Sequence, residues 1–244
     1  MWLRRLLVSL YGAVELAANT PDEVSWDDLP PTCVVQLHWR PTEPFCALLE
    51  RHSFMPVVLS RHPLAVLVSI LHFAQRESAT ALWLDGEAGT ECDLLDADPA
   101  SAAFLRYATS ARARVLLGLT PSWCEAPVPA IRMSYERLVD DPPRELERVT
   151  RRLGAPTCGS IAEALEANRF ESLRDAVSNE HFWRGSPDLW RTLVPASAAA
   201  EIAAAHAKLF DELGYEVEPD AELDEATART RWRSVAGPLE HVDS

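Results

Sequence analysis

Short apolar runs with the length of buried strands recur along this chain, each separated from the next by a segment of helical character. The clearest runs lie at 33–37, 56–60 and 129–134, and helical segments are expected at about 41–52 and 62–75. Strands joined by helical crossovers pair in parallel, and a parallel sheet needs helices on both faces. We therefore expect an α/β fold, a three-layer α/β/α domain with a central parallel sheet.

The two ends of the chain have different character. Apolar residues at 2, 3, 6, 7, 10 and 14 form the stripe of an amphipathic helix over about 2–18, which favours a helix over a signal peptide. Residues 76–98 have weak periodicity and are expected to form a loop or lid. Residues 218–244 are polar and acidic, so we expect a flexible tail after a single domain over 1–217. Further helices are expected at about 99–117, 142–153, 160–175 and 196–213.

Composition limits the partners. The formal charge of −14 disfavours nucleic acid and anionic membranes, and no apolar run approaches the roughly 20 residues of a membrane span. The five cysteines form no C-x-x-C pair, which favours a reducing, cytoplasmic location. Asp93, Asp96 and Asp98 lack calcium-loop spacing, so no metal site is expected. The oligomeric state is left open.

Chemistry-bearing residues leave three of the predicted strands. His38, Arg61 and Tyr135 come directly after them, and ligands of parallel α/β sheets bind beyond the carboxyl ends of the strands. Arg61 precedes a helix whose free N–H groups attract anions, and Ser69 lies eight residues further on the same helix. The spacing alone is equally compatible with Arg61 pairing with a surface carboxylate and Ser69 filling the core.

Four segments together resemble the PAPS-dependent sulfotransferases. The longest, at 57–73, is V-V-L-S-R-H-P-L-A-V-L-V-S-I-L-H-F, similar to the family's 3′-phosphate segment. V-Q-L-H at 35–38 resembles the strand that ends in the general-base histidine. S-Y-E-R-L-V-D-D-P at 134–142 resembles the segment whose tyrosine contacts adenosine. F-W-R-G at 182–185, followed by Trp190, is similar to the C-terminal loop. The resemblance covers about residues 2–215.

This resemblance implies a role for each matching residue. His38 would be the general base that takes the proton of a hydroxyl acceptor, and PAPS would be the co-substrate, with no metal. The residues that would bind PAPS are Arg61, Ser69, Arg184 and Gly185 at the 3′-phosphate and Tyr135, Trp2 and Phe170 at the adenosine. Trp39, Trp83 and the loop at 76–98 favour a small, partly apolar acceptor such as an alcohol, carbohydrate or phenol.

The chain also departs from the family pattern. The family's opening strand and its P-K-S-G-T-T-W loop, which holds the 5′-phosphosulfate, have no counterpart before Met1. No glycine occurs between Gly12 and Gly86, and the only lysine is Lys208. Three readings follow: a sulfotransferase whose true start lies upstream, a degenerate homologue that binds a nucleotide or partner without catalysis, or a nucleotide kinase-like enzyme. The last is disfavoured because the chain has no G-x-x-x-x-G-K-[ST] loop.

Overall fold

The computed structural model describes residues 1–76, 91–169 and 185–236. The chain forms two compact units. We call them the strand unit (residues 1–60 and 122–185) and the helical unit (residues 61–121 and 186–244). The chain passes from one unit to the other after Ser60, Pro121 and Gly185. The helix and strand pattern of the sequence predicts one domain and contains no sign of this division.

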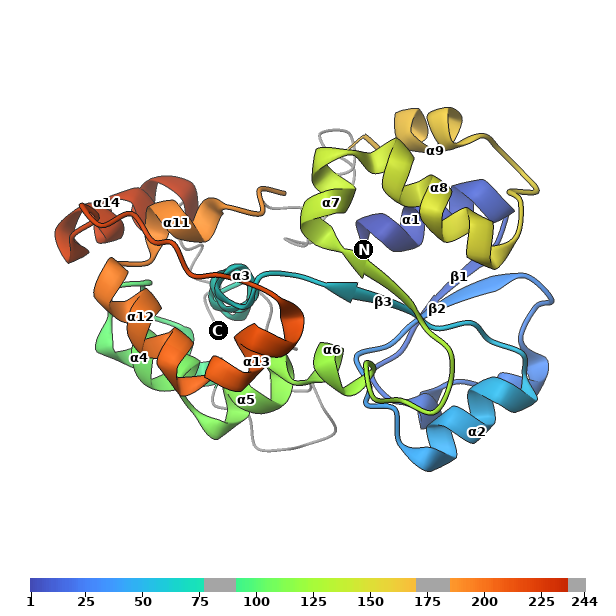
Figure 1. The fold of residues 1–244 in the computed structure, drawn as a ribbon, viewed down its shortest axis with the longest axis horizontal. Helices are drawn as coiled ribbons and strands as arrows, with labels where there is room; N and C mark the ends of the chain where they lie inside the picture. Colours follow the sequence, from blue (N-terminus) through green and yellow to red (C-terminus); the bar gives the residue numbers. More distant parts are fainter. Residues whose placement is uncertain (77–90, 170–184, 237–244) are drawn as a thin grey trace, which may run out of the picture. The chain divides into compact units, whose positions relative to one another are not determined.

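All four strands of the described residues lie in the strand unit (Figure 1). Helix α1 lies against β1 and β2, and helix α8 lies against β4. This unit contains α1 (Trp2–Tyr11), β1 (Val14–Ala17), η1 (Pro21–Glu23), η2 (Trp26–Asp28), β2 (Cys33–Gln36), α2 (Glu43–Arg51), β3 (Val57–Ser60), β4 (Ile131–Ser134), α7 (Tyr135–Asp140), α8 (Pro142–Leu153) and α9 (Ile161–Ala167).

The N-terminal segment contains a helix and a strand where the sequence predicts one helix over about 2–18. Helix α1 ends at Gly12, whose φ of 61° is the left-handed conformation that glycine adopts without strain. Strand β1 follows and pairs in parallel with β2, with Val14 opposite Cys33. The longer helix was wrong because the apolar residues after Gly12 fit a strand as well as a helical stripe, and Gly12 is a helix-stop signal.

The strands form two parallel pairs. Strand β3 pairs with β4, with Val57 opposite Ile131 and Ser60 opposite Ser134. Among the described residues, β2 pairs only with β1 and β3 only with β4. The predicted α/β class with parallel strands is therefore confirmed, and the strands form two separate two-stranded sheets.

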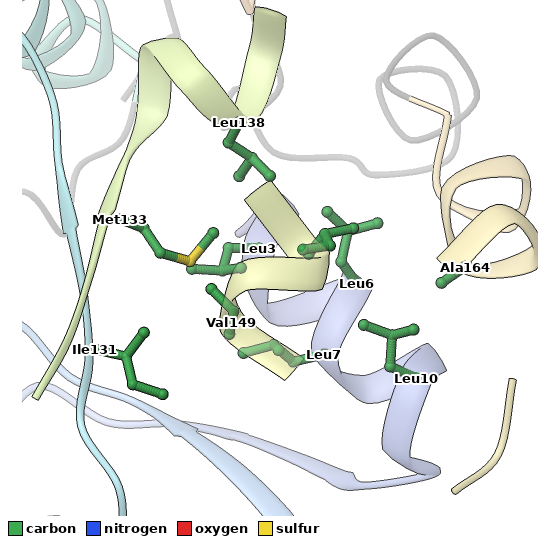
Figure 2. Packing of buried hydrophobic residues seen from close by; sticks show 10 residues of the cluster. Leu3, Leu6, Leu7, Leu10, Ile131, Met133, Leu138, Val149 and Ala164 are labelled. Carbon is green, nitrogen blue, oxygen red and sulfur yellow. The ribbon is translucent and has the colours of Figure 1, made fainter. Parts of the chain in front are cut away.

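One aliphatic cluster fills the interior of the strand unit (Figure 2). The leucines of α1 meet the inner side chains of β4 and α8, and Val34 of β2 and Val57 and Leu59 of β3 pack against the same cluster. Both strand pairs therefore lie against the same group of helices. The buried members are Leu3, Leu6, Leu7, Leu10, Ile131, Met133, Leu138, Leu146, Val149 and Ala164.

The described part of the helical unit has helices and one 3₁₀ turn. Pro63 occupies the first turn of α3, where its missing N–H costs nothing. Ser101 and Ser110 cap α4 and α5, which replace the single helix predicted over about 99–117. The elements are α3 (Pro63–Ala74), η4 (Glu91–Leu94), α4 (Ala102–Ala108), α5 (Ala111–Leu117), α11 (Leu189–Leu193), α12 (Ala196–Ala205), α13 (Ala207–Leu213) and α14 (Glu225–Ala236), with α6 (Leu119–Ser122) at the passage back to the strand unit.

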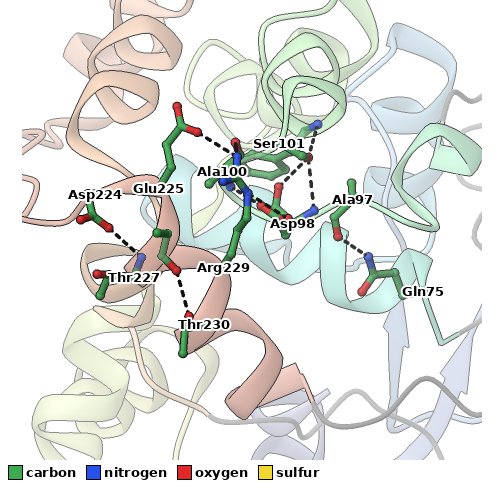
Figure 3. A network of polar contacts seen from close by, with 12 residues as sticks. Gln75, Ala97, Asp98, Ala100, Ser101, Asp224, Glu225, Thr227, Arg229 and Thr230 are labelled. Atoms are coloured by element: carbon green, nitrogen blue, oxygen red, sulfur yellow. Dashed lines mark hydrogen bonds and ion pairs between the residues drawn. The ribbon is translucent and has the colours of Figure 1, made fainter.

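The C-terminal segment differs from the flexible tail expected over 218–244. Residues 225–236 form helix α14, in which Ala228, Trp232 and Ala236 are buried. Figure 3 shows that Arg229 of this helix donates to the Ala100 carbonyl (3.3 Å), outside the helix, and to the Glu225 carboxylate (2.8 Å), within it. The sequence of 218–225 is acidic enough to suggest a solvated tail, but the apolar face of residues 225–236 buries a tryptophan.

A buried ion pair joins η4 to α4 and α5. Glu91 is 2% exposed, and its Oε1 accepts hydrogen bonds from Arg112 Nε and from the Tyr107 hydroxyl, each at 2.8 Å. Burial and the Glu91 carboxylate raise the pKa of Tyr107 above its ordinary value. The predicted loop at 76–98 therefore ends in a firmly packed turn, while its residues 77–90 lie outside the described part of the chain. In the described ranges, no helix is both long and apolar enough to cross a membrane.

Candidate functional site

Arg61 and Ser69 contact each other in the helical unit. Arg61 is the first residue after β3, and Ser69 lies on α3 two turns later. Arg61 Nη1 donates a hydrogen bond to Ser69 Oγ at 2.9 Å, and Nη2 lies 3.5 Å from the Ser186 carbonyl oxygen. Two donor groups, the Arg61 guanidinium just before α3 and the Ser69 hydroxyl two turns along it, are thus side by side. This arrangement suits a phosphate, because a guanidinium forms charge-assisted, often paired hydrogen bonds with phosphate oxygens.

The N-terminus of α3 is less open than the sequence suggests. The His62 ring caps this helix, with Nδ1 accepting the Leu64 N–H at 3.2 Å. One of the free N–H groups expected to attract an anion is therefore already satisfied. Sequence reasoning missed this cap because serine, threonine, aspartate and asparagine are the usual capping residues, and histidine is not among them.

His38 lies two residues beyond the end of β2, in the strand unit. The residue is exposed at the surface, although neighbouring protein atoms partly desolvate its ring. This desolvation lowers the pKa of His38 from 6.5, and the nearby ammonium of Met1 lowers it further. The Met1 amine in turn has a pKa of about 6, because it is buried and close to Arg4. A neutral imidazole at neutral pH is the state that a general base requires.

Tyr135 and Gly185 also contact each other, in the strand unit. Tyr135 begins α7, and its hydroxyl donates a hydrogen bond to the Gly185 carbonyl at 2.9 Å. Ser134 caps the same helix, and Gly185 has a φ of 68°. Tyr135, which the resemblance places at the adenosine, therefore bonds to Gly185, which the resemblance places in the C-terminal loop. Fifty positions separate the two residues in the sequence.

Trp2 belongs to the interior of the strand unit. Its ring packs against the aliphatic cluster, and its indole Nε1 donates to the Asn168 carbonyl at 2.9 Å. Asn168 is itself 6% exposed and bonded to Ser9 and Ala164. Trp2 thus has a structural role in which its polar atom is already used. Phe170 and Arg184, the other predicted binding residues, lie outside the described residues.

Trp39, which the sequence suggests as an acceptor contact, belongs to an aromatic group beside His38 whose other members the sequence does not indicate. Trp39 follows His38, and its carbonyl accepts a hydrogen bond from the Trp123 indole at 3.0 Å. Trp123 packs edge-to-face on Phe45, which contacts Trp26 in the same way. The tryptophans are half-buried. No sequence signal links Trp39 with Trp123, because 84 positions separate them and only the folded chain brings them together.

The predicted residues divide between the units: Trp2, His38, Tyr135 and Gly185 lie in the strand unit, and Arg61 and Ser69 lie in the helical unit. Within the described ranges, no three histidine, cysteine or carboxylate side chains are grouped to hold a metal ion. No model of a known protein family and no curated protein sequence matches this chain. The likeness to sulfotransferases therefore rests on the four sequence segments alone.

Proposed function

We propose that this protein is a PAPS-dependent sulfotransferase acting on a hydroxyl of a small acceptor. The observation that carries the proposal is the 2.9 Å contact between Arg61 and Ser69, the two residues that the longest motif assigns to the 3′-phosphate. Motif and geometry thus agree on one anion fork.

His38 supplies the proton chemistry in this proposal. The acceptor oxygen attacks sulfur in line, the bond from sulfur to the 5′-phosphate oxygen breaks, and the acceptor proton passes to the imidazole. Adenosine 3′,5′-bisphosphate (PAP) leaves with the bonding electrons. Such transfers depend on positioning and on charge stabilisation more than on covalent catalysis. Trp39 and Trp123, close to His38 in the chain and in the fold, offer an apolar surface for the ring of an acceptor.

The proposal includes a finer architecture. The residues of β2 and β3 are only half-buried, whereas Ile131 and Met133 of β4 are each 1% exposed. Inner strands of a parallel sheet are normally its most buried ones. One further strand that pairs with both β2 and β3 would join the two pairs into a single central sheet. In the family such a strand carries the phosphosulfate-binding loop.

A second function, nucleotide binding without transfer, is favoured by one observation. Lys208, the only lysine, is 89% exposed on α13, where it pairs with Glu212 at 3.3 Å. It therefore does not replace the lysine of the family's phosphosulfate loop. Loss of one charge-stabilising donor typically lowers the rate about 10²–10³-fold. Both functions predict nucleotide binding, and only the first predicts sulfate transfer.

Two measurements on the purified chain test both functions. PAP binding by calorimetry tests the anion fork, and sulfate transfer from radiolabelled PAPS to a panel of phenols, alcohols and sugars tests catalysis. We expect Arg61→Ala to weaken PAP binding about 10–100-fold, because a charged hydrogen bond contributes about 1.5–3 kcal/mol. Arg106→Ala, an exposed arginine of the same unit, is the matched control. Unchanged binding in Arg61→Ala would refute the proposed site.

His38 is tested separately. We expect His38→Ala to lower transfer about 10²–10⁴-fold while PAP binding is retained. Because the pKa of His38 lies below 6.5, the acidic limb of the rate profile should also lie below pH 6.5. PAP binding without any sulfate transfer in the wild type would favour the second function. Full transfer in His38→Ala would show that His38 is not the general base.

A further inference from the structure

His62 has an unusual environment for a residue next to a proposed anion site. It is 6% exposed, and its ring stacks on Trp190 with the centroids 4.4 Å apart and the planes 13° apart. Phe210 and Tyr215 contact it edge-on at 5.7 and 5.2 Å. Segments from three parts of the helical unit therefore close around this one ring.

Both ring nitrogens of His62 have backbone partners that fix its protonation state. Nδ1 accepts the Leu64 N–H at 3.2 Å, so Nδ1 carries no hydrogen. Nε2 lies 3.1 Å from the Glu216 carbonyl oxygen, which can only accept, so Nε2 carries the hydrogen. The neutral ring with its hydrogen on Nε2 satisfies both contacts at once.

We propose that His62 is an acid-sensitive cap, which holds the first turn of α3 in place only while its ring is neutral. A second proton would go to Nδ1 and place one N–H donor against another, that of Leu64. The cap on the Leu64 N–H would be lost and the first turn of α3 would loosen, while Nε2–H would still donate to the Glu216 carbonyl. Because Arg61 and Ser69 flank this turn, their contact would loosen with it.

The charges around His62 also disfavour a protonated ring. Arg61 precedes it, and the positive end of the α3 dipole follows it. On the Trp190 side, the Arg191 guanidinium lies 5.0 Å from the Trp190 ring centroid and is itself paired with Asp188 at 3.2 Å and Glu218 at 3.5 Å. From α13 and the residues after it, the ring meets Phe210, Tyr215 and the Glu216 carbonyl, and the Glu216 carboxylate itself is exposed. The unfolded chain takes up a proton at this position below about pH 6.5, so acid should favour unfolding.

Thermal unfolding of the full chain at about pH 7.5 and about pH 5.5, on either side of the ordinary histidine pKa, tests the proposal. In His62→Asn, the side-chain oxygen can still cap the helix, but it does not titrate. We expect the fall in Tm from the higher to the lower pH to be smaller in His62→Asn than in the wild type by about 2–5 °C, the size of one helix cap. In His62→Leu, Tm should be lower at both pH values, with the same reduced pH dependence. An identical pH dependence in wild type and His62→Asn would overturn the proposal.

A second measurement on the wild type does not depend on how the variants fold. Long-range proton–nitrogen NMR spectra report which ring nitrogen carries hydrogen, and contacts to Trp190 identify the His62 signals. We expect the Nε2–H form at about pH 7.5. A hydrogen on Nδ1, or a doubly protonated ring in the folded protein at about pH 5.5, would overturn the proposal.

The link to anion binding rests on the proposed function and is tested apart from it. We expect PAP affinity to fall between about pH 7.5 and about pH 5.5 by several-fold more in the wild type than in His62→Asn. An equal fall in both proteins would remove the link between the cap and the anion fork. If PAP binds neither protein at either pH, the proposed function fails, while the Tm and NMR results still decide the cap.

Discussion

The strand unit and the helical unit fill their interiors with different kinds of residue. The strand unit is built on one aliphatic cluster that joins α1, β4 and α8. The helical unit also has an apolar interior, with Trp190 and Phe104 fully buried, but it buries three histidines and the Glu91–Arg112 pair as well. Close packing stabilises the first unit through area removed from water, which does not depend on pH. The stability of the helical unit depends in addition on the charge state of its buried ionisable side chains.

Among the described residues of the strand unit, Glu145 is a buried ionised group. Glu145 is 4% exposed and accepts hydrogen bonds from Arg148 Nε at 2.9 Å and Nη2 at 2.7 Å. These bonds, helped by the charges of Arg148 and Arg137, outweigh burial and hold the pKa of Glu145 below 4.5. The contrast between the units is therefore one of degree, and it predicts different responses to mutation and to acid.

The largest expected effect comes from the buried ion pair of the helical unit. Arg112→Ala leaves the Glu91 carboxylate buried without its cation, which should lower the free energy of unfolding by about 3–5 kcal/mol. Lys208→Ala removes the exposed pair with Glu212 and should change it by less than about 1 kcal/mol. Urea denaturation measures both. A small effect in Arg112→Ala would mean that Glu91 does not stabilise this unit as an ion.

Trp232 tests whether α14 is part of the helical unit. It is 5% exposed, so Trp232→Ala should cost about 3–5 kcal/mol and increase amide exchange in α14. Thr230→Ala, on the exposed side of the same helix, should change stability by about 0.5 kcal/mol or less. If the two variants behave alike, residues 225–236 are a loosely attached tail.

Leu6 tests the aliphatic cluster of the strand unit. It is fully buried, and Leu6→Ala should cost about 2–5 kcal/mol through lost transfer energy and the cavity left behind. The same substitution at Leu95, which is 49% exposed in the helical unit, should change little. We expect the Leu6→Ala penalty to be equal at neutral and mildly acidic pH. If the loss of stability in Leu6→Ala changed with pH, the core of the strand unit would depend on pH as well, and the two units would not differ in this respect.

Acid should destabilise the two units at different pH values. This is the smallest of the expected effects. Because the folded pKa of Glu145 is lowered, its contribution is complete above 4.5 and is lost as pH falls through the folded value. The proposed His62 cap responds earlier, as pH falls below about 6.5. Hydrogen exchange followed against pH should therefore show α3 opening before α8. Simultaneous opening would show that the units unfold together.

Much of the site could be predicted where the information is local. Arg61 and Ser69 lie eight residues apart across one strand-to-helix junction, so their contact follows from local geometry. Tyr135 with Gly185, and Trp39 with Trp123, are far apart in sequence, and local periodicity says nothing about such pairs. Trp2 was predicted to contact adenine. In the folded chain its indole Nε1 donates to the Asn168 carbonyl, a partner 166 positions away that local periodicity does not indicate.

The sequence by itself determined the α/β class, the parallel pairing and the place of Arg61 at a strand end, because strand length, helical period and turn residues are properties of neighbouring positions. Only the tertiary structure decided that β1 is a strand, that the strands pair two by two and that residues 225–236 bury a tryptophan. Each of these depends on partners distant in the chain. Burial then selects between local conformations that the sequence leaves nearly equal in energy.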